Sequence, residues 1–314
     1  MDRKPVSVKS YANIAIVKYW GKADAERMIP STSSISLTLE NMYTETKLSF
    51  LPEDATSDVM YIDDELQGEK ETTKASKVLD LFRTNPNQYV KIETWNNMPT
   101  AAGLSSSSSG LSALVKAANE LFQVGKTQSE LAQIAKFASG SSSRSFFGPL
   151  AAWDKDSGDV YQVETDLKLA MIMLVLTDQK KPVSSRDGMK LCTETSTSFP
   201  EWIKQSEQDY KDMLGYLKTN DFQAVGELTE ANALRMHQTT STANPPFSYL
   251  TDASYQAMDK VKALRASGEQ CYFTMDAGPN VKVLCLEEDL DRLADHFRKD
   301  YQVIVSRTKE LPDA

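Results

Sequence analysis

Residues 99–110 read PTAAGLSSSSSG, a run of small and hydroxyl-bearing side chains inside an otherwise ordinary globular sequence. Serine-rich tracts are usually flexible spacers, because they bury too little apolar surface to offset the entropy of ordering. The neighbouring residues favour a different structure. Residues 89–95 (YVKIETW) alternate as a strand does, and apolar side chains then recur at helical spacing at Leu111, Leu114, Val115, Ala118 and Phe122. The stretch is therefore predicted to be a loop between a strand and a helix.

A loop at the start of a helix can bind phosphate. Unpaired backbone N–H groups and a partial positive charge point outward from the first helical turn. The small side chains of Ala101, Ala102 and Gly103 would let a phosphate approach the backbone, and the serine hydroxyls add donors or metal contacts. It is not a Walker A loop, because no Gly-Lys-Ser/Thr follows. On these residues alone, a phosphate cradle and an ordinary serine-capped helix are equally good interpretations.

Composition limits the partners of the chain. Its 314 residues, 40% of them hydrophobic, are enough to bury a substantial core in two closely joined domains. The formal net charge of -9 argues against nucleic acid or an anionic membrane as the main partner. An anionic ligand would therefore need basic side chains gathered at one place.

Cysteine and histidine usage indicates reduced thiols and gives no sign of a metal site. Cys192, Cys271 and Cys285 are widely spaced and show neither a disulfide framework nor a zinc pattern. His237 and His296 lie in helix-like segments without a companion at metal-binding spacing. The polar N-terminus carries no secretory or transit signal, so a cytoplasmic protein is expected.

Periodicity predicts an α+β protein with two lobes. Strand-like alternation dominates the first half, where helices are expected at 73–82 and 111–122. The second half is expected to hold amphipathic helices followed by strands around one more helix. These helices are placed at 199–218, 222–237, 254–267 and near 289–298, and the strands at 270–275, 280–286 and 302–306.

The apolar run 169–176 (LAMIMLVL) is too short to span a bilayer and is typical of a buried central strand. The pattern breaks after it, at residues 177–185 (TDQKKPVSS). We therefore expect one domain at 1–180 and a second at 181–314, with a ligand cleft between the two lobes.

Residues 12–22 (ANIAIVKYWGK) are the first of four stretches that gather polar side chains beside small or apolar ones. An apolar strand ends here in Lys18, Tyr19 and Lys22. Lysine and a tyrosine hydroxyl together suit a phosphate or diphosphate. Without further context, an ordinary solvated strand end explains them better.

Two more stretches carry arginine. Residues 138–148 (ASGSSSRSFFG) place Arg144 among small neighbours, where a planar carboxylate or phosphate could be held by two parallel hydrogen bonds. A surface arginine near a helix N-cap is the alternative. Residues 180–189 (KKPVSSRDGM) concentrate basic side chains, Arg186 among them, and are also consistent with a solvated linker.

The fourth stretch, residues 273–280 (FTMDAGPN), contains a single aspartate, Asp276. Such a residue is usually part of a turn. Held rigidly at a strand end, its carboxylate could instead accept or orient the proton of a substrate hydroxyl. Taken singly, each stretch is best explained structurally. Together they supply the groups that ATP and an anionic, carboxylate-bearing substrate would need.

PTAAGLSSSSSG resembles the nucleotide-phosphate loop of the GHMP kinase superfamily. The combination of ANIAIVKYWGK, ASGSSSRS, SSRDGM and YFTMDAGPN resembles the diphosphomevalonate decarboxylase family, in its bacterial form, over essentially the whole chain. One departure is local, because the family often continues after the Arg-Ser motif with Gly-Gly-Phe, where this chain has Gly148, Pro149 and Leu150. That difference puts the backbone path at this point in question.

The resemblance implies a two-lobed GHMP-kinase-like fold. Its N-terminal lobe would be an S5-domain-2-like nucleotide-binding domain, and its C-terminal lobe a ferredoxin-like α+β domain. It also implies ATP-dependent decarboxylation of mevalonate 5-diphosphate to isopentenyl diphosphate, with Mg²⁺, in the mevalonate pathway of isoprenoid biosynthesis. A homodimer is expected from the family alone.

The resemblance also assigns roles to residues. The catalytic set would be Asp276, Arg144 and Lys18. The substrate, including its diphosphate and carboxylate, would contact Asn13, Tyr19, Lys22, Ser139, Ser141, Arg144, Ser185, Arg186 and Met189. ATP would contact Ala101, Gly103, Ser105, Ser106, Ser107, Ser108, Ser109 and Lys181, with Ser106 and Ser107 also near Mg²⁺.

Three other interpretations stay open from the sequence. A GHMP small-molecule kinase, for example one acting on phosphomevalonate, would stop at phosphorylation. A non-catalytic nucleotide-binding protein would keep the loop but lack a base, and Asp276 argues against it. A structural protein with serine linkers would be sensitive to proteases at 105–109.

Overall fold

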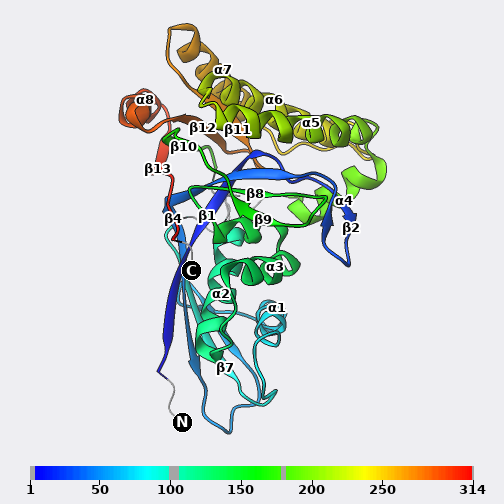
Figure 1. The fold of residues 1–314 in the computed structure, drawn as a ribbon, viewed down its shortest axis with the longest axis vertical. Coiled ribbons are helices and arrows are strands. Elements are labelled where there is room, and N and C mark those ends of the chain that lie inside the picture. The colour runs from blue at the N-terminus through cyan, green and yellow to red at the C-terminus, as the bar shows by residue number, and fades with distance from the viewer. Residues whose placement is uncertain (1–3, 99–105, 178–181, 313–314) are drawn as a thin grey trace.

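The computed structural model describes residues 4–98, 106–177 and 182–312 (Figure 1). Within them, the N-terminal half is built on the long strand β4 (Ser34–Phe50). β4 pairs antiparallel with β1 (Val6–Val17) along one edge, and with two shorter strands along the other. The remaining strands of this sheet are β7 (Val90–Asn96), β8 (Leu150–Trp153), β9 (Val160–Gln162), β5 (Val59–Ile62) and β6 (Glu65–Leu66).

Helices α1 (Glu69–Leu79), α2 (Ser106–Phe122) and α3 (Gln128–Ala138) lie together on one side of this sheet (Figure 1). α2 packs on β1 and β4, and its apolar stripe, including Val115, joins the core of the N-terminal half. The strand and the helix predicted around the serine-rich loop are thus confirmed, whereas α3 was not predicted. Of the predicted loop at residues 99–110, residues 106–110 instead belong to α2, so the helix begins five residues earlier than predicted, and residues 99–105 lie outside the described residues.

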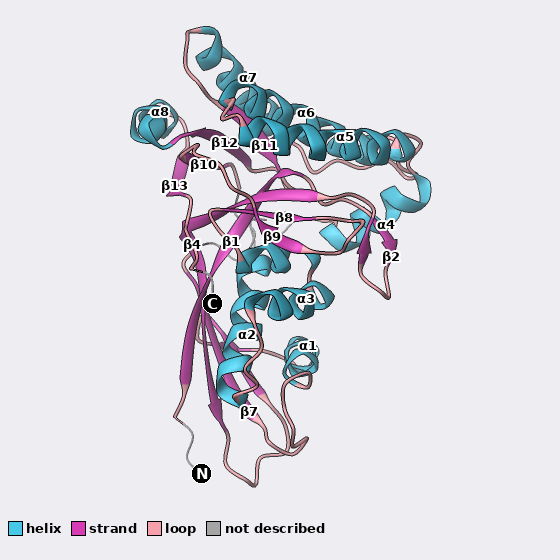
Figure 2. Cartoon of the chain, in the orientation of Figure 1, coloured by secondary structure: helices cyan, strands magenta, loops and turns pink. Residues whose placement is uncertain are grey.

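A four-stranded antiparallel sheet forms the C-terminal half (Figure 2). Its order is β11 (Tyr272–Met275), β12 (Val281–Leu286), β10 (Leu169–Val175) and β13 (Gln302–Arg307). The apolar run predicted to be a buried central strand is β10, which lies between β12 and β13. Helices α7 (Asp252–Ala266) and α8 (Leu290–Arg298) pack on one face, and α5 (Phe199–Lys218) and α6 (Phe222–Ser241) pack near the other.

One hydrophobic core joins the two sheets. It contains Ile14 and Leu37 from the first sheet, Met173 and Leu284 from the second, and Met213 from α5. The sheets also meet where Thr308, directly after β13, forms an antiparallel β-bridge with Leu39 of β4. The expected boundary at 180/181 stays a prediction; β10, which precedes it, pairs within the second sheet.

The segment around Ser185, for which a solvated linker was one interpretation, contains helix α4 (Ser185–Thr195). Ser184 caps it by accepting a hydrogen bond of 3.1 Å from the backbone N–H of Asp187. The smaller elements are β2 (Lys22–Asp24), β3 (Ile29–Pro30) and the 3₁₀ turns η1 (Gly140–Phe146) and η2 (Glu287–Asp289). Among the described helices, none is both long and apolar enough to cross a membrane.

Candidate active site

Asp276 lies in the turn between β11 and β12, where two ammonium groups meet its carboxylate. Lys18, directly after β1, donates a hydrogen bond of 2.8 Å from Nζ to Asp276 Oδ1. Lys282, the second residue of β12, places its Nζ 3.1 Å from Oδ2. The carboxylate is therefore held between the two halves of the protein by a cation from each.

Burial and charge set the protonation of this group. Lys18 is almost fully buried, and burial lowers the pKa of its ammonium to about 8, although Asp276 opposes that shift. Burial pushes the pKa of Asp276 upward, but Lys18 and Lys282 outweigh it and the net shift is downward. The carboxylate is thus ionised at neutral pH. Its side chain is 24% exposed, although its Oδ2 is buried.

Arg144 sits on η1 and is buried, with its guanidinium fixed by strand β4. Its Nη1 donates 2.6 Å to Ser34 Oγ, and its Nε donates 3.0 Å to Ser36 Oγ. Burial lowers the pKa of Arg144 to about 10, while the nearby Asp276 and Tyr19 raise it. The residue stays charged at neutral pH, and two neutral hydroxyls set its plane without neutralising it.

Asn13 reaches the same segment from β1. Its Nδ2 donates to the backbone carbonyl of Ser141 at 2.9 Å and to Ser145 Oγ at 2.8 Å. Its Oδ1 is buried and has no hydrogen-bond partner within the described part of the chain. Asn13 therefore connects η1, and with it Arg144, to β1, the strand that Lys18 follows.

Lys22 and Arg186 form a second basic group, which lies beside Tyr19 and, through it, Arg144. The Tyr19 ring packs on Trp153 at a centroid distance of 5.0 Å, and its buried hydroxyl has no partner among the described residues. Burial raises the pKa of Tyr19 to about 12, against the opposing effect of Arg144 and Arg186. Partial burial and Arg186 both lower the pKa of Lys22. An acidic protein thus gathers cations here.

Small residues shape this region. The hydroxyls of Ser139 and Ser141 share a hydrogen bond of 3.2 Å. At Gly140, an added Cβ would lie 2.7 Å from the Tyr19 ring, so the ring position requires glycine. Ser185 begins α4, and Met189 on the same helix is buried in an apolar cluster with Trp20. Their contacts with substrate stay predictions.

The predicted nucleotide residues are only partly described. Ala101, Gly103, Ser105 and Lys181 lie outside the described residues, and the side chain of Ser106 is not described. Ser107 is exposed in the first turn of α2, whereas Ser108 and Ser109 are buried. Ser109 Oγ shares a hydrogen bond of 2.7 Å with Thr44 Oγ1. Ser108 and Ser109 therefore point into the protein, where they can shape the helix start.

Two family models match the chain. Residues 10–163 match a diphosphomevalonate decarboxylase-like N-terminal domain, and residues 171–312 match a mevalonate 5-diphosphate decarboxylase C-terminal domain. The diphosphomevalonate decarboxylase of Candida albicans is 30% identical over 94% of this chain and 88% of its own length. This chain belongs to the diphosphomevalonate decarboxylase family.

Solved structures of diphosphomevalonate decarboxylases share its fold. The mevalonate pyrophosphate decarboxylase of Streptococcus pyogenes is 68% identical, with a TM-score of 0.97 over 100% of this chain and 99% of that one. The mevalonate diphosphate decarboxylase of Enterococcus faecalis is 39% identical, with a TM-score of 0.89 over 99% and 100%. A structure of MDDEF in complex with MVAPP, AMPPCP and magnesium is 40% identical, with a TM-score of 0.90 over 98% of both chains.

The local departure from the diphosphomevalonate decarboxylase pattern lies just before β8. At Gly148, an added Cβ would lie 2.1 Å from the Lys309 carbonyl oxygen, so the close approach of the chain's end requires a glycine. Strand β8 begins at Leu150 and pairs with β4. The altered sequence therefore still leads directly into the sheet.

Sequence reasoning missed three residues of this diphosphomevalonate decarboxylase site. Lys282 interrupts the apolar strand VKVLCL, and a charge in a buried strand was the signal that could have found it. Ser34 and Ser36 recur with the period of a strand in SISLTL, which places both hydroxyls on one face of β4. Only the fold shows that Arg144 lies over that face.

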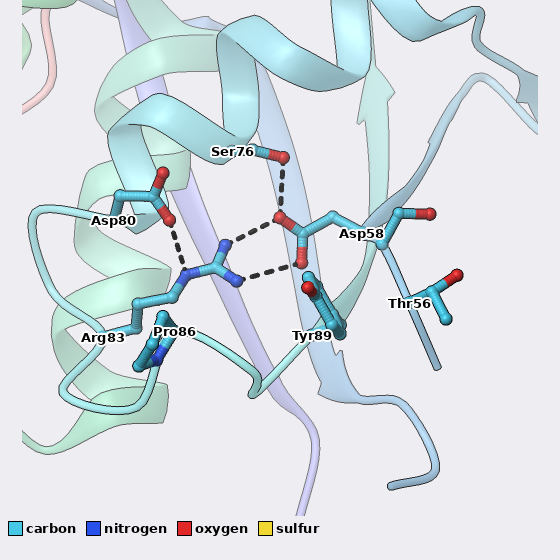
Figure 3. A pocket seen from close by; sticks show the side chains of 8 residues that line it. Thr56, Asp58, Ser76, Asp80, Arg83, Pro86 and Tyr89 are labelled. Atoms are coloured by element: carbon cyan, nitrogen blue, oxygen red, sulfur yellow. Dashed lines mark hydrogen bonds and ion pairs between the residues drawn. The ribbon is translucent and has the colours of Figure 1, made fainter. Parts of the chain in front are cut away.

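Two cavities lie away from these residues. One, of about 420 Å³, is lined by Arg83, whose guanidinium pairs with Asp58 at 2.7 Å and Asp80 at 2.9 Å (Figure 3). The other, of about 650 Å³, lies between α2 and Leu311. Neither is lined by a predicted site residue, and the expected cleft between the lobes stays a prediction. The described residues contain no group of three or more His, Cys, Asp or Glu side chains placed to hold a metal ion.

Proposed function

We propose that this chain catalyses the ATP-dependent decarboxylation of mevalonate 5-diphosphate to isopentenyl diphosphate, with release of ADP, phosphate and carbon dioxide. Family membership supports the reaction class. The observation that carries the proposal is the ionised Asp276 carboxylate, paired with Lys18 and Lys282 and lying close to Arg144. The cations of this site suit a substrate with several negative charges. The single carboxylate suits the hydroxyl that reacts.

The chemistry explains why ATP is needed. The substrate is a β-hydroxy acid with a tertiary hydroxyl, and hydroxide is a poor leaving group. Transfer of the ATP γ-phosphoryl group to this oxygen breaks the P–O bond to ADP and the O–H bond of the hydroxyl. The oxygen becomes a phosphate ester, ADP leaves, and the proton passes to water. The C–O bond then breaks and phosphate leaves with the bonding electrons. The electrons of the adjacent C–C bond form the new double bond as carbon dioxide departs.

Asp276 would lie next to the tertiary hydroxyl. A general base works best when its pKa is near the working pH, whereas the two ammonium groups hold the pKa of Asp276 low. We therefore assign Asp276 mainly to orienting the hydroxyl and to stabilising the positive charge that develops at the tertiary carbon. Lys18 holds the carboxylate in place.

Arg144 would bind the substrate carboxylate. Ser34 and Ser36 already fix Nη1 and Nε, so the guanidinium is oriented before the ligand arrives. Asn13 would assist from the neighbouring strand. The diphosphate and the neighbouring part of the substrate would lie against the second basic group, with contacts to Tyr19, Lys22, Ser139, Ser141, Ser185 and Arg186. Met189 is a weaker candidate for a contact with the substrate.

ATP would bind where α2 begins. Backbone N–H groups of the first helical turn and the exposed Ser107 suit phosphate oxygens and a phosphate-bound cation. Mg²⁺ takes oxygen ligands and usually keeps several waters, so phosphates and hydroxyls such as those of Ser106 and Ser107 fit it. When bound, Mg²⁺ supplies positive charge that offsets the charge of the transferring phosphoryl group.

The deciding experiment is incubation with ATP, Mg²⁺ and mevalonate 5-diphosphate. Equal amounts of carbon dioxide and ADP are the expected result. ADP without carbon dioxide would indicate a kinase that stops at phosphorylation. ATP binding without substrate-dependent ADP release would indicate a non-catalytic nucleotide-binding protein.

We also propose a cytoplasmic homodimer that acts in the mevalonate pathway of isoprenoid biosynthesis. The support for the homodimer is resemblance to the family. Light scattering coupled to size-exclusion chromatography should give twice the mass of one chain. A mass equal to one chain would contradict the dimer and leave the proposed reaction untouched.

A further inference from the structure

Lys282 is a buried ammonium group in an apolar setting. Its side chain is 0% exposed. In the antiparallel register of β11 and β12 it stands opposite Thr274, two positions before Asp276. The next residue on the same face of β12, Leu284, belongs to the core that joins the two sheets. An ammonium group on this face therefore lies where an aliphatic side chain would normally pack.

Few groups satisfy this ammonium. Lys282 Nζ makes no hydrogen bond of normal geometry within the described ranges, and its recorded ionic contact there is the one with Asp276 Oδ2. Burying a charge costs several kcal/mol unless ion pairing and hydrogen bonds compensate for it. A single ion pair at 3.1 Å does not fully compensate for the cost of burying the ammonium group. A contribution to folding stability therefore does not explain a lysine at this position.

We propose that Lys282 is a positioning residue, whose ammonium group fixes the second oxygen of Asp276 and keeps that carboxylate ionised and aimed at the ligand. The inference rests on the proposed function and adds a residue to it. Lys18 binds Oδ1 and Lys282 binds Oδ2, so the two contacts together restrict rotation of the carboxylate about its Cβ–Cγ bond.

Four titratable groups from separate parts of the chain surround Asp276. Lys18 follows β1, Lys282 lies on β12, Arg144 lies on η1, and His237 lies on α6. Burial and Lys18 lower the pKa of His237 to about 4, so its imidazole is neutral near pH 7. The described cations that act on the carboxylate at that pH are therefore Lys18, Lys282 and Arg144.

Lys282→Met removes the charge and keeps the length of the side chain. Loss of one of two close ammonium groups should raise the pKa of Asp276 by about 1–3 units. We expect kcat to fall roughly 10–100-fold with the KM for ATP within about twofold, and the acidic limb of the kcat/KM profile to move to higher pH. Lys282→Gln, a neutral polar replacement, should do the same if the Met variant folds poorly.

Lys260→Met is the matched control. Lys260 lies in the same half of the protein and pairs with Asp300, away from Asp276. Its replacement should lower the Tm without moving the pH profile. Wild-type kcat and an unmoved acidic limb in both Lys282 variants would overturn the proposal.

A thermal-unfolding cycle tests the pair without activity. We compare the wild type with Asp276→Asn, Lys282→Met and the double variant at pH 7. If the groups are coupled, the Tm of the double variant should exceed the additive value by about 3 °C or more. Additive changes would overturn the proposal. Absence of carbon dioxide release by the wild type would overturn the proposed function instead, and would leave this cycle interpretable.

Discussion

Lys18 and Asp276 lie 258 positions apart in the sequence, yet Lys18 Nζ and Asp276 Oδ1 are 2.8 Å apart in the structure. One follows the first strand of the N-terminal sheet, and the other follows β11 of the C-terminal sheet. The ion pair therefore exists only when the two halves are packed on their shared core. A change that separates the N-terminal half from the C-terminal half should therefore also abolish activity.

Asp276→Asn should lower kcat by about 10²–10³-fold, because the neutral amide cannot counter the positive charge that develops on the substrate. Binding of mevalonate 5-diphosphate should persist. Carbon dioxide release and calorimetric titration with the substrate measure the two effects. Asp300→Asn, which also removes a carboxylate paired with a lysine, is the control and should keep normal turnover. Near-normal turnover of Asp276→Asn would refute the assigned role.

Arg144→Ala should lower kcat/KM severely, because a buried charged partner of a carboxylate is worth about 2–5 kcal/mol. This corresponds to roughly 30–5,000-fold. Ser36→Ala should have a smaller effect, since it removes one of the two hydroxyls that orient the guanidinium. Steady-state kinetics of both variants provides the comparison. Unchanged kinetics of Arg144→Ala would show that the guanidinium does not bind substrate.

The alkaline side of the pH profile should report Lys18. Its pKa is lowered to about 8, so the free enzyme loses this ammonium as the pH rises through that value. The kcat/KM for mevalonate 5-diphosphate should therefore fall above about pH 8. Lys18→Arg should move this limb to higher pH, because the guanidinium stays protonated. An identical limb in the variant would assign it to another group.

The lowered pKa of Lys18 also predicts how the free energy of unfolding changes with pH. Between about pH 8 and 10.5 the folded state has released the Lys18 proton while the unfolded state still holds it. Unfolding then takes up a proton, so the contribution of Lys18 to the free energy of unfolding rises with pH. Denaturant unfolding of the wild type and Lys18→Met across this range measures the difference in slope. A steeper rise in the variant would contradict the shift.

Tyr19→Phe should weaken binding of the diphosphate and leave the chemical step nearly unchanged. The lost hydroxyl is worth about 0.5–1.5 kcal/mol. The KM for mevalonate 5-diphosphate should rise about 2–13-fold at similar kcat. Tyr161→Phe, which removes a hydroxyl bonded to Tyr210, is the control. A fall in kcat without a change in KM would place Tyr19 in the chemical step.

Regular elements were predictable where one face of the chain is continuously apolar. α5 was predicted with the bounds that the structure has, and β10 was recognised because it is buried on both faces. α4 was not recognised as a helix, because its polar sequence SRDGMKLCTET contains a glycine and offers few apolar positions. Its buried face contains Met189 and Cys192, and only the packing of α4 against the rest of the protein shows that this face points inward.

Arg144 and Asp276 could be named as candidates from the sequence because their side chains carry charge in otherwise small or apolar stretches, while their roles came from the resemblance and stay predictions. The partners of these residues were not predictable, because they are common side chains whose role depends on contacts with residues far away in the sequence. Ser34 and Ser36 look like polar positions of a strand until η1 lies over them. Asp276 looked suited to act as a base, but Lys18 and Lys282 together hold its pKa low, and the sequence analysis did not consider Lys282.

The chain beyond β13 returns to the first sheet, where Lys309 donates a backbone hydrogen bond of 2.8 Å to the Thr38 carbonyl. Thr38 lies on the strand that also carries both anchors of Arg144. The C-terminal segment thus helps to hold in place the strand that orients the Arg144 guanidinium. Truncation after Arg307 would remove this hydrogen bond. The shortened enzyme should bind the substrate carboxylate more weakly while it still keeps its overall fold.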